Sequence, residues 1–131
     1  MVRERVASII IRNKKILLVK DNWADFFSSP GGLVDAKENY EDALSRELDE
    51  ELMMKIGKSK FYFSFEYTHT KFNEKQIEHN FIVFSDDEPK VSGEISEFGW
   101  FTKDDIQNEK VKTLSLYLDN LFQKLIEDGL L

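Results

Sequence analysis

Short apolar runs, separated by polar turns, dominate the start of the chain and its middle. Residues 6–11 and 16–19 are nearly continuous in apolar side chains, which is typical of strands covered on both faces. The polar residues Arg12 to Lys15 lie between them, so we predict a hairpin. Aromatic residues occupy alternate positions from Phe61 to Tyr67, which is the period of a strand, here predicted over residues 60–70. Two further runs predict strands at 81–84 and 94–102. The intervening stretches predict loops at 21–29 and 85–93, and a loop or hairpin tip at 72–78.

Two longer stretches have helical periodicity. The first helix begins at Asn39, whose side chain can cap the first turn. Met53 does not easily adopt the left-handed conformation that ends many helices, so we expect this helix to continue to Gly57. A short helical turn is predicted at 103–106. The closing helix, over 113–126, has an apolar stripe that we interpret as core packing, made of Leu114, Tyr117, Leu118, Leu121, Phe122 and Leu125.

Composition narrows the class of protein. The 131 residues suit one domain, residues 1–131, and the eleven Phe and 41% hydrophobic residues suffice for a packed core. Strands combined with two helices predict an α+β fold class. A net charge of −7 disfavours a nucleic-acid polymer as partner, because phosphate backbones need clustered Lys and Arg. Since there is no cysteine, thiol catalysis, disulfides and cysteine zinc sites are excluded.

The remaining sequence-wide signals concern histidine and the membrane. His69 and His79 are too few and too far apart to indicate a zinc site, and we interpret both as surface or packing residues. We find no signal peptide, no lipidation motif and no apolar run of about 18 residues. We therefore expect a soluble cytoplasmic protein with no membrane contact. The oligomeric state stays open, with a homodimer as one option.

Three carboxylates gather on one border of the first helix. At about 100° per residue, Glu47, Glu50 and Glu51 share an arc of roughly 100°. Three anions at such close quarters repel one another, and a hard divalent cation is their natural compensation. The alternative is a solvated acidic helix face, which is common for runs of Glu. The cluster by itself leaves both interpretations open.

The glycine pair Gly31-Gly32, just upstream of this helix, favours the cation. The stretch that begins at Gly32 resembles the Nudix box, GX5EX7REUXEEXGU, in which U is aliphatic. Eight of its nine specified positions match, and the second glycine is replaced by Met53. Lys37 also stands where a glycine often precedes the box glutamate in this family. The matching positions are Gly32, Glu38, Arg46, Glu47, Leu48, the pair Glu50-Glu51, and Met54.

The resemblance implies a Nudix fold, a mixed β-sheet sandwiched between α-helices, and hydrolysis of a diphosphate linkage in a nucleoside diphosphate joined to another group. It implies Mg²⁺ as cofactor, with Mn²⁺ as a substitute. The metal ligands it implies are Glu47, Glu50, Glu51 and the Gly31 carbonyl, and one of these glutamates doubles as the catalytic base.

The resemblance also assigns supporting residues. Arg46 pairs with Glu38 to brace the loop against the helix, so we give Arg46 an orienting role in catalysis and Gly32 a structural one. Family members often place a further acid before the late strand. Glu94 fits that place as an additional metal ligand and catalytic acid, with Glu97 as second choice. An ordinary loop carboxylate is the alternative for both.

The substrate is the least determined part of the prediction. The small size of the chain favours a MutT-like nucleoside triphosphate pyrophosphohydrolase. ADP-ribose, nucleotide sugars, dinucleoside polyphosphates and a non-catalytic nucleotide-sensing module stay as alternatives, whereas the acidic balance disfavours RNA ends. Trp23 is a candidate for stacking on a nucleobase, and Phe27 is interpreted as a core residue. Lys20 is a candidate phosphate contact, as are Arg12, Lys71 and Lys75.

Overall fold

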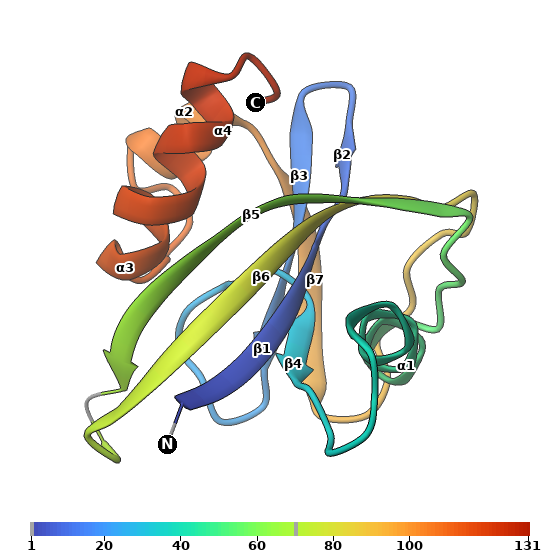
Figure 1. The fold of residues 1–131 in the computed structure, drawn as a ribbon. Coiled ribbons are helices and arrows are strands. Elements are labelled where there is room, and N and C mark those ends of the chain that lie inside the picture. The colour runs from blue at the N-terminus through green and yellow to red at the C-terminus, as the bar shows by residue number, and fades with distance from the viewer. Residues whose placement is uncertain (1, 70) are drawn as a thin grey trace.

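The computed structural model describes residues 2–69 and 71–131, in which two β-sheets lie between helices (Figure 1). The strands are β1 (Val2–Ile9), β2 (Ile11–Arg12), β3 (Lys15–Asp21), β4 (Gly31–Leu33), β5 (Lys58–His69), β6 (Glu74–Phe84) and β7 (Ile95–Phe101). The larger sheet has the order β4-β1-β6-β5, with β1 and β6 parallel and the other pairs antiparallel. The smaller sheet, β2-β3-β7, is antiparallel. The predicted mixed sheet between helices is confirmed, with its strands divided between two sheets.

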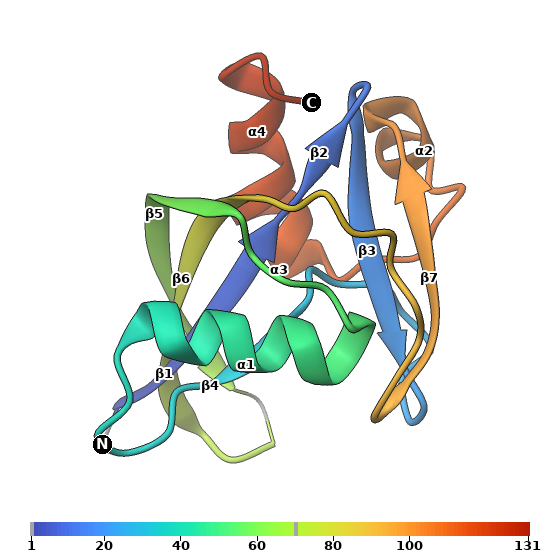
Figure 2. The same ribbon diagram turned by 90° about the vertical axis from the view of Figure 1, so that its right-hand side faces the viewer.

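The helices form two groups on opposite sides of the sheets (Figure 2). Helix α1 (Tyr40–Leu52) lies on one side. The other side carries α2 (Lys103–Gln107) and the closing helix. That closing helix consists of α3 (Ser115–Tyr117), a π-helical stretch η1 (Leu118–Phe122) and α4 (Gln123–Glu127). Among the described residues, no helix is long and apolar enough to cross a membrane.

Two hydrophobic clusters fill the spaces between helices and sheets. The first lies under α1 and the second under the closing helix. Successive residues of β3 alternate between them, because Leu17 and Val19 belong to the first cluster and Ile16 and Leu18 to the second. The continuous apolar runs are therefore explained by burial on both faces, as predicted.

The first hairpin differs from the prediction. Residues 6–11 were expected to pair as one strand with residues 16–19. Instead, β1 pairs with β4 and β6 in the larger sheet, and only the two residues of β2 form the hairpin with β3. The chain passes from one sheet to the other at Ile10, whose carbonyl accepts from the Leu17 N–H at 2.9 Å. A single apolar run thus contributes strands to two different sheets, and its hydropathy pattern does not show where one strand ends and the next begins.

The loop or hairpin tip predicted at 72–78 is found only up to Asn73, where the chain turns between β5 and β6; from Glu74 onward the prediction is wrong, because β6 begins there. Polar Gln76, Glu78 and Asn80 alternate along β6 with Ile77 and His79, and all three polar side chains are buried. They are polar because they face the cleft side of the sheet, described below, and not because the segment is a loop. The preceding strand β5 ends at His69, and Thr70, the last residue of the predicted strand, lies outside the described residues.

The alternation of aromatic residues in β5 is also interrupted. The register of β5 against β6 shifts between Phe61 and Phe63. As a result, Phe61 packs edge-on against Phe81 of the first cluster, whereas Phe63 and Phe65 belong with the second. A bulge of this kind inserts one residue and moves the following side chains to the other face.

The predicted continuation of α1 to Gly57 is wrong, since the helix ends at Leu52. Met53 adopts the left-handed conformation, with φ 55° and ψ 38°, and its N–H donates to the Asp49 carbonyl. The N–H groups of Lys90 and Ser92 donate to the carbonyls of Leu52 and Glu51 at 2.9 and 3.0 Å. These bonds satisfy the end of the helix and offset the roughly 1–2 kcal/mol that this conformation costs a residue with a side chain.

Candidate active site

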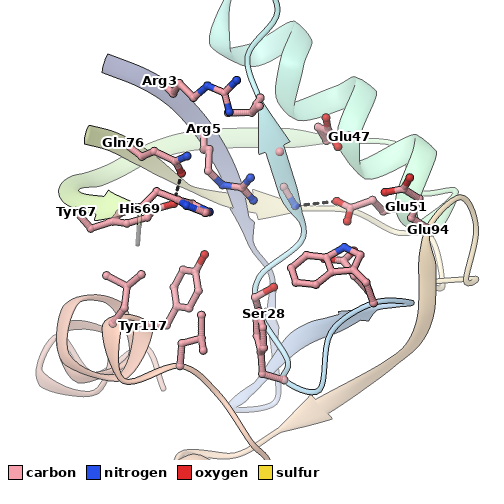
Figure 3. A pocket seen from close by; sticks show the side chains of 18 of the residues that line it. Arg3, Arg5, Ser28, Glu47, Glu51, Tyr67, His69, Gln76, Glu94 and Tyr117 are labelled. Atoms are coloured by element: carbon pink, nitrogen blue, oxygen red, sulfur yellow. Dashed lines mark hydrogen bonds between the residues drawn. The ribbon is translucent and has the colours of Figure 1, made fainter. Parts of the chain in front are cut away.

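A cleft of about 1220 Å³ lies between the free edge of β4, helix α1 and the start of the closing helix (Figure 3). Asn39 caps α1 as predicted, with its side chain accepting from the Asp42 N–H at 2.7 Å. The buried side chains of α1 face the first hydrophobic cluster. That packing turns the border with Glu47, Glu50 and Glu51 toward the cleft, which all three line. We call these three residues the carboxylate wall.

Gly31 and Gly32 belong to β4; a side chain at Gly31 would clash with the backbone of β1, and one at Gly32 would displace the Glu47 carboxylate. A Cβ at Gly31 would lie 2.1 Å from the Val6 carbonyl oxygen, and one at Gly32 would lie 2.4 Å from the Glu47 carboxylate. Gly31 lies between the hydrogen-bonded pairs of β1 and β4, so its N–H and C=O point away from β1. The N–H donates to Glu51 Oε1 at 2.8 Å. The Gly31 carbonyl therefore faces the same side as the carboxylate wall.

Arg46 compensates part of the negative charge of the carboxylate wall, because its Nη1 lies 2.8 Å from Glu47 and 3.6 Å from Glu50. Burial, aided by the nearby charges of Glu47 and Asp21, raises the pKa of the Glu51 carboxyl to about 8. Burial also raises the pKa of Glu47, although hydrogen bonding from Arg46 opposes this. The Glu50 side chain is 58% exposed. The Glu51 carboxyl, which is costly to ionise in this environment, is thus stabilised as a carboxylate by a cation.

Arg46 connects the loop before α1 with the carboxylate wall. Its Nε and Nη2 donate to the two oxygens of Glu38, both at 2.9 Å, so the predicted pair is present. Nη2 also donates to the Leu33 carbonyl at 3.1 Å, and Nη1 donates to Glu47 at 2.8 Å. Hydrogen bonding from Arg46 lowers the pKa of Glu38 to about 2. Arg46 therefore holds Glu47 as well as Glu38, a contact that the prediction did not include.

The donor set fits a hard divalent cation in its chemistry. Three carboxylates and a peptide carbonyl are oxygen ligands, which Mg²⁺ and Mn²⁺ prefer. In residues 2–69 and 71–131, no three acidic or histidine side chains converge enough to hold an ion as they stand. Glu47 is bonded to Arg46, and Glu51 is bonded to the Gly31 N–H. Binding a cation therefore requires these side chains to exchange hydrogen bonds for metal contacts.

The two acids proposed outside the box differ in position. Glu94 lines the cleft together with Asp21, whose pKa is raised by burial and, less strongly, by Glu94. The Glu94 carbonyl accepts from the Asn22 N–H at 2.8 Å, which fixes its backbone beside β3. Glu97 instead faces Lys20 at 3.6 Å and does not line the cleft. The structure favours Glu94 and adds Asp21, which sequence analysis had placed in an ordinary loop.

The substrate candidates divide in the same way. Trp23 lines the cleft and is 72% exposed, with its ring edge-on to Phe26. Phe27 packs in the second cluster against Phe101, as interpreted from the sequence. None of the four cations named as phosphate contacts lines the cleft, namely Arg12, Lys20, Lys71 and Lys75. Arg12, for example, donates to the Ser85 and Asp87 carbonyls and holds that loop.

Sequence analysis missed the wall opposite the carboxylates. It consists of Arg5 on β1, Tyr67 on β5, Gln76 on β6 and Tyr117 on α3, and we call it the polar–aromatic wall (Figure 3). The Tyr67 hydroxyl donates to Gln76 Oε1 at 2.6 Å. One available signal was the period-2 alternation of polar residues in β6. Another was the stripe of the closing helix, in which Tyr117 lines the cleft instead of serving the core alone.

The sequence of residues 2–122 matches the family model of the NUDIX domain. No curated protein matches this chain closely enough to count as a relative. Among solved structures, a MutT Nudix hydrolase from Burkholderia pseudomallei is 26% identical, and the alignment covers 79% of this chain and 85% of that one, with a TM-score of 0.73.

Two further structures share the fold at lower identity. A MutT protein from Methanosarcina mazei Go1 is 21% identical, covering 98% of this chain and 95% of its own, with a TM-score of 0.81. A bifunctional NMN adenylyltransferase/ADP-ribose pyrophosphatase from Francisella tularensis, complexed with AMP and a manganese ion, is 20% identical. That alignment covers 98% of this chain and 42% of the larger protein, with a TM-score of 0.76.

Proposed function

Because this chain belongs to the Nudix family of hydrolases, we propose that it hydrolyses, with Mg²⁺, the diphosphate linkage of a nucleoside diphosphate joined to another group. A nucleoside triphosphate is the favoured substrate, in the manner of a MutT-like pyrophosphohydrolase. The likeness to the MutT Nudix hydrolase of Burkholderia pseudomallei supports this choice. The AMP and manganese ion of the Francisella protein support a nucleotide and a divalent cation.

One observation carries the proposal. The carboxylate wall and the Gly31 carbonyl meet at one end of a cleft large enough for a nucleotide. The buried Glu51, whose pKa is raised to about 8, lies among other acids there. Such a cluster is costly for stability and is best explained by a ligand of opposite charge.

Each residue then has a stated task. Glu50, Glu51 and the Gly31 carbonyl are assigned to the cation, and Glu47 either joins them or positions the attacking water. When bound, the cation neutralises phosphate charge and helps to deprotonate water. Arg46 orients Glu47 through the 2.8 Å bond from its Nη1. Glu94 and Asp21 supply further carboxylates from the neighbouring side of the cleft.

The test is a panel of nucleoside triphosphates, ADP-ribose, nucleotide sugars and dinucleoside polyphosphates, with both products identified. We expect hydrolysis with Mg²⁺, none in EDTA, and recovery when Mg²⁺ or Mn²⁺ is returned. Full activity in chelator would contradict the assignment. A protein that binds nucleotides but releases no product from any of them is the sensing module of the alternative hypothesis.

A further inference from the structure

Arg5 is unusual because the buried part of its guanidinium faces a carboxylate but makes no hydrogen bond within the described residues. Its side chain is 29% exposed, and its Nε is buried with no hydrogen-bond partner in the described part of the chain. The nearest carboxylate oxygen, Glu78 Oε1, lies 3.5 Å away. Arg5 lines the cleft, and its guanidinium points across it between Gln76 and Glu51 (Figure 3). Unused donors in such a position are costly unless a ligand completes them.

Glu78 lies beneath Arg5 and is almost inaccessible, with its side chain 2% exposed. The parallel register of β1 and β6 sets Arg5 directly opposite Glu78. The Tyr117 hydroxyl donates to Glu78 Oε1 at 3.3 Å, while Oε2 is buried and has no hydrogen-bond partner among residues 2–69 and 71–131. Buried ion pairs seldom stabilise a fold more than apolar residues of the same size. The pair is therefore better explained by the orientation that it gives to Arg5 than by stability.

The position of Arg5 indicates which anion it meets. Six acids line the cleft, whereas Arg3 and Arg5 are the arginines in the lining and no lysine belongs to it among the described residues. Arg3 is at the rim, 45% exposed and paired with Glu74. Arg5 instead lies between two parts of the cleft. On one side is the carboxylate wall, where the linkage to be cleaved would bind. On the other side are the aromatic residues around Tyr67 and Tyr117, which suit a nucleoside. The group at that junction is the phosphate attached to the nucleoside.

We propose that Arg5 binds the phosphate attached to the nucleoside, and that Glu78, supported by Tyr117, is the positioning residue that holds the Arg5 guanidinium across the cleft. The proposal rests on the proposed function, because it assumes that the cleft takes a nucleotide. An arginine fork matches two phosphate oxygens at once. Neither Arg5 nor Glu78 belongs to the box, and neither was selected by sequence analysis.

The first experiment titrates the protein with AMP in the presence of Mg²⁺, since AMP has no diphosphate linkage and binds without turnover. Arg5→Gln should lower AMP affinity by about 10- to 100-fold, and Arg5→Lys should give an intermediate loss because it keeps the charge but not the fork. Affinity for Mg²⁺ alone should not fall, since removing a cation near Glu47 and Glu51 cannot weaken metal binding electrostatically. The control is Lys103→Gln, which removes an exposed cation of α2 outside the cleft lining and should change neither affinity.

The second experiment tests whether Glu78 acts through Arg5. Glu78→Gln should raise KM and weaken AMP binding by about tenfold with kcat little changed, and this effect should disappear in the Arg5→Gln background. If Glu78 were merely structural, Glu78→Gln would weaken AMP binding equally in the natural chain and in the Arg5→Gln variant. If single variants fold poorly, the double variant Arg5→Met, Glu78→Met leaves no stranded charge, and it should be as stable as the natural chain while losing AMP binding.

The outcomes separate the two proposals. If the protein hydrolyses a diphosphate but Arg5→Gln keeps both AMP affinity and KM within twofold, the Arg5 assignment is overturned and the proposed function stands. If no diphosphate is hydrolysed but AMP binds through Arg5, the proposed function fails and the anion site stands. If the natural chain neither binds AMP nor hydrolyses any compound of the panel, both are overturned.

Discussion

The two walls of the cleft are built in different ways. The carboxylate wall comes from one helix, and Glu47, Glu50 and Glu51 lie within five consecutive residues. The polar–aromatic wall takes one residue from each of four elements spread from β1 to α3. A wall on a single helix is determined by helical geometry, whereas a wall assembled from several strands depends on register and topology. The first is therefore visible in a sequence, and the second becomes visible only in the fold.

The largest expected effect comes from removing charge from the carboxylate wall. Glu50→Gln and Glu51→Gln keep the side-chain shape, and turnover at saturating Mg²⁺ should fall by about 10²–10⁴-fold, as should turnover of Glu47→Gln. The metal-free stability of Glu51→Gln should rise, because a buried carboxylate surrounded by acids is replaced by a neutral amide. Turnover and metal-free thermal midpoint are measured together for each variant. Near-native turnover of Glu50→Gln and Glu51→Gln would show that these carboxylates are only a solvated face.

Substitution of Glu38 tests whether the pair Glu38–Arg46, which supports the carboxylate wall, has a role distinct from that of the wall itself. Its carboxylate bonds to Arg46 twice and to the Asp35 N–H at 3.0 Å, and it does not line the cleft. Glu38→Gln should lower the thermal midpoint and reduce turnover by only about tenfold, as for partners that orient a ligand. Thermal melts and steady-state kinetics of the same preparations check this. If turnover fell by about 10³-fold or more at unchanged stability, Glu38 would instead have a direct role in catalysis.

The pH dependence of stability tests the charge on the carboxylate wall without any substrate. The pKa of Glu51 is about 8 in the fold against an ordinary 4.5, so between these values the folded protein keeps a proton that the unfolded chain has released. Stability in EDTA should therefore decline as pH rises through about 4.5 to 8, and Glu47 and Asp21 act in the same direction.

Mg²⁺ should reverse this trend, because a cation takes the place of the proton and its stabilising effect grows with pH. Glu38, whose pKa is lowered to about 2, contributes stability that is lost only as pH falls toward that value, below this window. The measurement is the thermal midpoint against pH, with EDTA and with Mg²⁺. Glu51→Gln should flatten the EDTA curve, and an already flat curve for the natural chain would contradict the buried charge.

The smallest expected effect concerns the backbone that frames the carboxylate wall. Met53 and Lys37 stand where the box favours glycine, and both have the positive φ that glycine would adopt, 55° and 70°. Met53→Gly should therefore stabilise the protein by up to about 1 kcal/mol and leave turnover intact. If the helix continued to Gly57, the same substitution would destabilise the protein, because glycine is unfavourable inside a helix. Gly129→Ala is the inverse control, because Gly129 has φ 76° and open space around it, so it should destabilise by a similar amount. Denaturant titration measures both changes.

Much of the fold was predictable where the signal is local. The continuous apolar run in β3, the cap at Asn39 and the closing helix were all recognised, since each depends on neighbours in sequence. The errors fall where distant segments decide. The end of α1 depends on the N–H groups of Lys90 and Ser92, which come from a distant segment. The polar residues at 74–78 are typical of a loop, and only the fold shows that they belong to a strand with a polar face.

The sequence by itself determined the carboxylate wall and the glycine pair, because one helix and its preceding loop place them together. The pairing of Arg46 with Glu38 was implied by the resemblance to the Nudix box. Only the tertiary structure decided that Glu94 lines the cleft while Glu97 does not, and that Lys20 lies outside the lining. It also decided that Arg5 faces Glu78, since the parallel register of β1 and β6 joins residues 73 positions apart. Helical spacing is written into the chain, but strand pairing between remote segments follows from the packing of the whole core.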